Sequence, residues 1–172
     1  MQLVYKYDMN YILTHKKSIK KELLNKDNFI SKNIAILGGS TTSEIKNILE
    51  LFLLDYGIKP NFYESEFGKY YEDSIFENKL LEDFKPDIIY VHTTSRNIIN
   101  FPNITCSFEE IDNFLIDEYK RYELMWEKLF SKYKCTIIQN NFEYPNVRLL
   151  GNRDCYDKRG RVNFVTRLNQ MF

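Results

Sequence analysis

The sequence predicts a three-layer α/β fold, a parallel sheet with helices on both faces. Two observations predict it. Short apolar runs of the kind that form buried parallel strands alternate with longer segments whose apolar residues recur at helical spacing. The chain has 172 residues, of which 44% are hydrophobic and 28% are charged, a composition and length typical of one globular domain.

Three short apolar runs and one mixed segment are predicted as strands. Glycine, amide, hydroxyl or charged residues follow each of them, and such residues commonly end strands. In chain order the predicted strands are residues 33–37, 60–63, 87–91 and 135–138.

The segments before, between and after these strands have helical apolar spacing. Thr41 and Glu44 stand in the S/T-x-x-E relation of a capping box, and so do Ser107 and Glu110. Both pairs therefore mark predicted helix starts. The predicted helices cover, in chain order, residues 10–25, 45–57, 70–84, 107–129 and 161–171.

Composition argues against several classes of function. Lys+Arg and Asp+Glu both number 24, so the chain lacks the basic surplus that nucleic-acid binding requires. The three cysteines form no CxxC pair, which argues against a disulfide framework or a metal site. No apolar run has the length of a membrane span or signal peptide. We expect a cytoplasmic protein with no metal, cofactor, membrane or nucleic-acid partner.

Small polar residues follow the predicted strands at their carboxyl ends, where parallel α/β sheets bind ligands. The first strand runs into Gly38-Gly39-Ser40, the third into residues 92–97, and the fourth into residues 139–141. This convergence predicts the functional site. The candidate residues are Gly39, Ser40, Gly68, His92, Thr94, Arg96, Asn97 and Asn140.

Ser40 suits two roles at the start of a helix, where unpaired backbone N–H groups favour negative charge. It could be a nucleophile beside an oxyanion, or it could bind a phosphate or carboxylate. Gly68 and Asn97 would donate hydrogen bonds to the same point. The alternative is that Ser40 and its neighbours only cap the helix.

The basic side chains leave further alternatives open. A histidine at a strand end, such as His92, is more often structural than catalytic, and His15 is predicted to be solvated. Arg96, Arg148 and Arg153 are candidates for anion recognition, because guanidinium groups bind phosphate and carboxylate in a bidentate manner. Their alternative role is in surface salt bridges.

The order of these motifs resembles that of the SGNH (GDSL-like) hydrolases, with their flavodoxin-like parallel sheet. The resemblance implies that Ser40 is the nucleophile. It also implies that the Ser40 N–H, Gly68 and Asn97 form an oxyanion hole. Two departures are that Gly39 replaces the aspartate of Gly-Asp-Ser and that residues 92–95 replace the usual Gly-x-Asn-Asp.

Several segments are similar to the N-terminal SGNH-like domain of FkbH-like proteins, of HAD-superfamily subfamily IIIC. These proteins join that domain to a HAD-type phosphatase domain and load a glyceryl unit onto an acyl carrier protein. The resemblance implies acyl or glyceryl transfer to a carrier protein or glycan, in the biosynthesis of a polyketide-like or surface polysaccharide product. The segments that carry it are residues 34–42, 84–89, 138–143 and 150–152.

The SGNH family's base is a histidine in a D-x-x-H block after a fifth strand, and the 172 residues contain no such block. Nor do they contain the D-x-D-x-T/V motif of a HAD phosphatase. We therefore expect residues 1–32 to be an N-terminal helical extension and residues 33–172 to be an SGNH-like domain that lacks its last strand. Three functions stay open. The first is an esterase or acyltransferase that uses Ser40, the second is a non-catalytic module that binds a phosphoryl or acyl group or a carrier protein, and the third is a purely structural or interaction domain.

Overall fold

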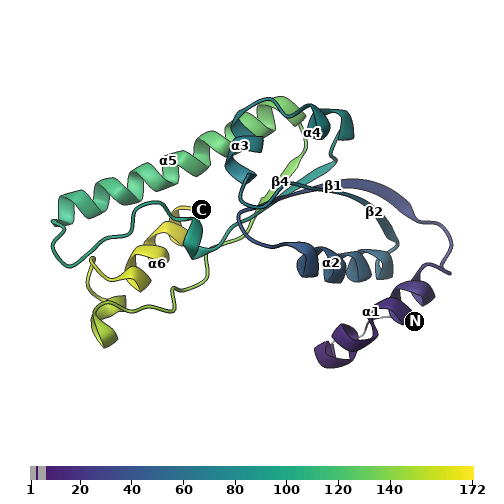
Figure 1. Ribbon diagram of the computed structural model, residues 1–172, viewed down its shortest axis with the longest axis horizontal. Coiled ribbons are helices and arrows are strands. Elements are labelled where there is room, and N and C mark those ends of the chain that lie inside the picture. Colours follow the sequence, from purple (N-terminus) through teal and green to yellow (C-terminus); the bar gives the residue numbers. More distant parts are fainter. Residues whose placement is uncertain (1–2, 4–6) are drawn as a thin grey trace.

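A computed structural model describes residue 3 and residues 7–172, and it shows a parallel sheet with helices on both faces (Figure 1). The strands are β1 (Ile30–Gly38), β2 (Ile58–Glu64), β3 (Ile88–His92) and β4 (Thr136–Gln139). They lie in the order β2-β1-β3-β4, and every neighbouring pair is parallel. This arrangement confirms the predicted α/β class.

Helices form the outer layers. Their bounds are α1 (Met9–Leu23), α2 (Ser43–Asp55), α3 (Tyr70–Ile75), α4 (Lys79–Phe84), α5 (Phe108–Tyr133) and α6 (Arg161–Met171). On one face lies α2, with α1 packed against it, whereas α3, α5 and α6 share the core on the other. None of the helices in the described part of the chain is long and apolar enough to cross a membrane.

The central strand β1 is apolar on both of its faces because helices cover both. Ala35 and Leu37 belong to the core beneath α5. Ile34 and Ile36 alternate with them and therefore point to the opposite face, where α2 lies. All four side chains are buried, which explains why the sequence shows a continuous apolar run here.

The predicted helix over residues 70–84 is wrong, because the segment forms two helices. The first, α3, ends at Ile75. Asn78 then starts α4 as its N-cap, and the Asn78 side chain accepts a hydrogen bond of 3.1 Å from the Leu81 N–H. An asparagine that caps a new helix cannot at the same time continue the old one, so the helical pattern is interrupted.

One predicted capping box is confirmed and the other is wrong. The Ser107 hydroxyl accepts from the Glu110 N–H, and Glu110 accepts from the Ser107 N–H, at the start of α5. At the start of α2 the N-cap is Thr42, whose hydroxyl donates to Glu64 on β2 (3.0 Å). Glu44 instead forms an ion pair with Lys16 on α1. Tertiary partners therefore replace the local cap of α2.

Two short 3-10 helices, η1 (Ser95–Asn97) and η2 (Gly151–Cys155), lie in segments that the sequence pattern left as irregular. The first follows β3 directly, and Thr94 caps it through a capping box with Asn97. The second precedes α6. The first therefore lies at the carboxyl end of the sheet.

Candidate functional site

The carboxyl ends of β1 and β3 form the topological switch point of this sheet, because β1 has β2 on one side and β3 on the other. Gly38 pairs with His92 in the register, and the Gly39 N–H donates to the His92 carbonyl (2.8 Å). A pocket of about 580 Å³ opens at this end. Its lining residues are Ser40, Thr94, Ser95, Arg96, Ile98, Phe101, Glu143, Tyr144, Pro145, Asn146, Val147 and Arg161.

Asn97 lies against the turn that carries Ser40, as predicted. Its side-chain amide donates to the Gly39 carbonyl (3.0 Å), and its Oδ1 accepts from the Thr94 N–H (2.8 Å). A Cβ atom on Gly39 would lie 2.6 Å from the Asn97 side chain. Glycine at position 39 therefore permits the close approach, and the aspartate of Gly-Asp-Ser would displace the Asn97 side chain from this position.

Gly68 also reaches this turn, but its N–H already has an acceptor. That N–H donates to the Gly38 carbonyl (3.2 Å), and the Gly38 N–H in turn donates to the Ser65 hydroxyl (3.0 Å). Gly68 has a φ of +79°, in the left-handed region that glycine adopts readily. The loop after β2 therefore braces the turn after β1.

His92 hydrogen-bonds within the protein rather than to Ser40. Its Nδ1 lies 2.9 Å from the Tyr90 hydroxyl. Burial lowers the pKa of His92, against the opposing charge of Glu143, so the imidazole is neutral at pH 7. His15 is exposed on α1, as predicted. Among the described residues no hydrogen bond joins a histidine to Ser40.

Asn140 fastens the end of β4 to the end of β3. Its Oδ1 accepts from the Thr93 N–H (2.9 Å), and its amide donates to the Thr93 carbonyl (2.7 Å). The side chain of Gln139 adds a hydrogen bond to the Thr93 hydroxyl (2.9 Å). Thr93 is fully buried, so Asn140 shapes the site by holding two strand ends together.

Of the twelve lining residues only Ser40, Thr94 and Arg96 are predicted candidates, and the unpredicted ones include two charged residues, Glu143 and Arg161. Glu143 follows β4, and its carboxylate accepts from both the N–H (3.1 Å) and the hydroxyl (2.8 Å) of Ser95. Arg161 is the first residue of α6, and its guanidinium carbon lies 5.1 Å from the centroid of the Phe101 ring. Glu143 lies in residues 138–143, one of the segments that are similar to FkbH-like proteins. No sequence motif indicated Arg161.

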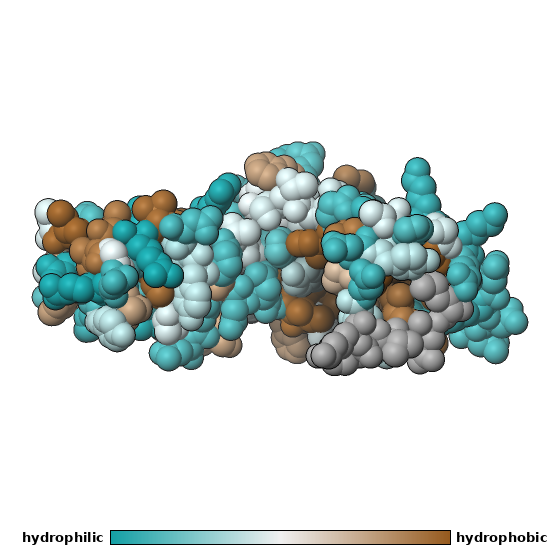
Figure 2. Space-filling view, turned by 90° about the horizontal axis from the view of Figure 1, so that it is seen from below, coloured by the Kyte–Doolittle hydropathy of each residue, from teal (hydrophilic) through white to brown (hydrophobic). Residues whose placement is uncertain are grey.

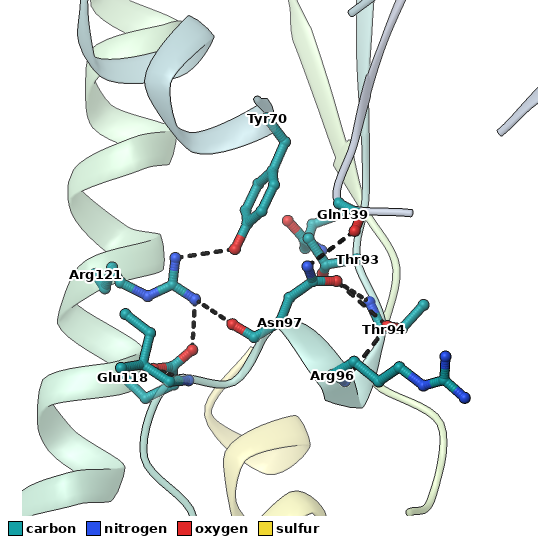
Figure 3. A network of polar contacts seen from close by, with 10 residues as sticks. Tyr70, Thr93, Thr94, Arg96, Asn97, Glu118, Arg121 and Gln139 are labelled. Carbon is teal, nitrogen blue, oxygen red and sulfur yellow. Dashed lines mark hydrogen bonds and ion pairs between the residues drawn. The ribbon is translucent and has the colours of Figure 1, made fainter. Parts of the chain in front are cut away.

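A buried ion pair on α5 supports the site from behind (Figure 3). Arg121 donates to the Tyr70 hydroxyl (3.0 Å) and the Asn97 carbonyl (3.0 Å), and it pairs with Glu118. Glu118 also accepts from the Ile99 N–H (3.3 Å). This network connects α3 to the segment around η1, so two loops that meet at the pocket share one support.

Of the predicted anion-binding arginines, only Arg96 lines the pocket. Its side chain is exposed, and in Figure 3 it points away from the Arg121 network. Arg153 instead faces Asp157 (3.8 Å), and Arg148 is exposed and outside the pocket lining. Thr94 lines the pocket next to Arg96 and accepts from the Arg96 N–H (3.3 Å).

Comparison with known proteins gives one structural similarity. No family model and no curated protein matches the chain. The fold is similar to the crystal structure of the N-terminal part of the protein BF1531 from Bacteroides fragilis, which contains a phosphatase domain and is complexed with Mg. The TM-score is 0.69 at 14% identity, over 90% of this chain and 40% of that one. The chain thus shares an α/β fold with part of a protein more than twice its length.

Proposed function

We propose that this chain is the SGNH-like domain of an FkbH-type protein and takes part in acyl or glyceryl transfer to a carrier protein or glycan. In this proposal the domain holds the transferred group in the pocket beside Ser40. The observation that carries the proposal is the position of Ser40, which lines the pocket at the switch point with Asn97 fastened to the preceding Gly39.

A phosphatase domain is the first proposed partner. The structurally similar protein contains such a domain, and this chain covers only 40% of it. The FkbH-type motifs in residues 34–42 and 138–143 support the same association. An acyl carrier protein is the second proposed partner, because it would present the group that the pocket holds.

The contacts around Ser40 favour holding a ligand over performing the chemistry alone. The Gly68 N–H already donates a hydrogen bond to the Gly38 carbonyl, and the His92 ring is hydrogen-bonded to the Tyr90 hydroxyl. A serine hydroxyl without a base beside it is a weak nucleophile at neutral pH. The chemistry would then take place on groups that another domain supplies.

A calorimetric titration tests the binding role. The unmodified chain is titrated with phosphoglycerate and with a phosphopantetheinyl carrier protein, and we expect heat of binding with at least one of them. Ser40→Trp fills the pocket and should weaken binding by more than about tenfold. Ser31→Trp is the matched control, because Ser31 is exposed near the opposite end of β1. No heat at millimolar ligand, or equal affinity in both variants, would contradict the proposal.

A second candidate function is ester or acyl transfer with Ser40 as the nucleophile. The half-buried Ser40 side chain makes no hydrogen bond to any of the described residues, so its hydroxyl is free to meet a substrate. Hydrolysis of a p-nitrophenyl ester by the wild type, abolished in Ser40→Ala, would support this role. Equal background rates in the two proteins would rule it out for this chain.

A further inference from the structure

We propose that Arg96 and Arg161 form an anion-binding subsite of the pocket and that its ligand carries a phosphate monoester. This inference rests on the proposed function, since it names the group that the pocket would recognise. Arg96 approaches from η1 and Arg161 from the start of α6, and both line the pocket with Ser40. The subsite therefore joins two segments that lie more than sixty residues apart in the sequence.

Neither arginine forms an ion pair in the part of the chain that the structure describes. Four of the five other arginines meet carboxylates, among them Arg121 with Glu118, Arg159 with Asp157 (2.8 Å) and Arg167 with Asp112 (2.5 Å), and the fifth, Arg148, is exposed outside the pocket. Buried guanidinium groups are expected to have acceptors, because an unpaired donor away from water is costly.

Unpaired buried donors occur in Arg121, Arg167 and Arg161, and among the described residues only Arg161 of these three lacks a carboxylate partner as well. Its Nε is buried without a hydrogen-bond partner among the described residues, and its guanidinium packs on the ring of Phe101. Stacking on an aromatic ring fixes the plane of the guanidinium without using its N–H donors. The donors thus remain available to an oxyanion in the pocket.

The charge of the pocket supports a dianion. Its ionised lining residues are two arginines and Glu143, so its net charge is positive in a chain whose formal net charge is zero. The Glu143 carboxylate accepts its hydrogen bonds from Ser95 and pairs with neither arginine. Two guanidinium groups match a doubly charged phosphate monoester better than a singly charged carboxylate.

One N–H of the first turn of α6 has an acceptor from within the protein. The Asp154 carboxylate accepts from the Val162 N–H (2.7 Å) and from the Leu150 N–H (3.1 Å). Asp154 is buried, so it fixes the first turn of α6 and with it the position of Arg161. The positively charged side chains of the pocket are the two arginines.

The rest of the pocket wall limits what the phosphate can be attached to. Ile98, Phe101 and Val147 provide an apolar side beside the arginines. Figure 2 shows patches of apolar surface at the end of the molecule that carries α6 and also in the half that carries α1 and α2. We infer that the phosphate is carried on a short carbon chain that can lie along this wall.

Calorimetric titration of the intact chain with glycerol 3-phosphate tests the subsite. We expect Arg161→Gln and Arg96→Gln each to weaken binding by about tenfold or more, because each removes charge-assisted hydrogen bonds. Arg161→Lys keeps the charge but loses the planar fork, so we expect an intermediate loss. Arg153→Gln is the matched control, since Arg153 is exposed and outside the pocket, and it should bind like the wild type. Thermal melts establish that each variant is folded.

The ligand series separates the possible outcomes. Glycerate should bind more weakly than glycerol 3-phosphate, and glycerol should not bind. Equal affinity for glycerate and glycerol 3-phosphate would overturn the choice of a phosphate. Unchanged affinity in both Gln variants, together with loss of binding in Ser40→Trp, would overturn the subsite and leave the proposed function standing. Absence of binding in every protein would contradict both proposals.

Discussion

The two walls of the candidate site use arginine in opposite ways. On the α5 side, Arg121 is buried and has three polar partners, Glu118, Tyr70 and Asn97. On the pocket side, Arg96 and Arg161 have no carboxylate partner among the described residues. The same side chain therefore supports the fold where it is paired and is available to a ligand where it is not.

The presence of a carboxylate partner therefore distinguishes an arginine expected to stabilise the fold from one expected to bind a ligand. Burial works to lower the pKa of Arg121, but the ion pair with Glu118 raises it overall, so Arg121 stays charged and acts as a fixed support. Removing that support should lower the free energy of unfolding strongly. Removing Arg96 should change binding and leave stability nearly intact, because its side chain is exposed.

The largest expected effect is that of Arg121→Met. The substitution leaves the Glu118 carboxylate, only 4% exposed, without its cation, which should cost about 3–5 kcal/mol of unfolding free energy. Urea denaturation measures the loss. The matched comparison is Arg96→Met, for which we expect a change below about 0.5 kcal/mol.

A double variant sharpens this first prediction. Glu118→Gln combined with Arg121→Met removes the unpaired charge and keeps an acceptor for the Ile99 N–H. We expect the double variant to be more stable than Arg121→Met alone. If the double variant were the less stable protein, the buried charge would not be the cause of the loss.

Asp154→Ala should have the next largest effect. It removes the acceptor of two backbone N–H groups, those of Leu150 and Val162, and each unsatisfied donor costs about 1–3 kcal/mol. Because the first turn of α6 carries Arg161, glycerol 3-phosphate should also bind more weakly. Denaturation and calorimetry measure the two effects. A loss of stability with unchanged affinity would show that the cap does not position Arg161.

Gly39→Ala should destabilise the protein by a smaller amount, about 1–3 kcal/mol, because the new methyl group overlaps the Asn97 side chain. A double-mutant cycle with Asn97→Ala measures the coupling between the two positions. We expect Gly39→Ala to cost less in the Asn97→Ala background, where the overlap is relieved. If the two losses of unfolding free energy were strictly additive, the methyl group introduced at position 39 would not be in contact with the Asn97 side chain.

The smallest effect concerns His92, which lies half-buried near both walls. Its pKa is lowered in the folded protein below the ordinary value of 6.5. As the pH falls below that value, the unfolded chain binds a proton that the folded chain does not, so stability falls. Thermal melts between pH 7.5 and 5.5 should show a smaller fall in His92→Gln than in the wild type. If the melting temperature fell equally in both proteins, protonation of His92 would not be the cause of the loss of stability.

The sequence alone determined the class of fold and the end of the sheet at which to look. Buried parallel strands must be apolar on both faces, so the run at residues 33–37 predicts β1. The Ser107–Glu110 cap and the helix over residues 161–171 depend on neighbours in the chain and were also predicted. The proximity of Asn97 to Gly39 followed from the rule that parallel strands end on one edge.

The tertiary structure decided which polar groups are free. The Thr42 hydroxyl donates to Glu64 and accepts no hydrogen bond from its own helix. The Gly68 N–H donates to the Gly38 carbonyl, because groups distant in sequence compete for the same donors. Whether an arginine is paired is likewise set by what packs beside it. Arg121 and Arg161 both lie in helices, but the packing of the helices places a carboxylate beside Arg121 and, among the described residues, none beside Arg161.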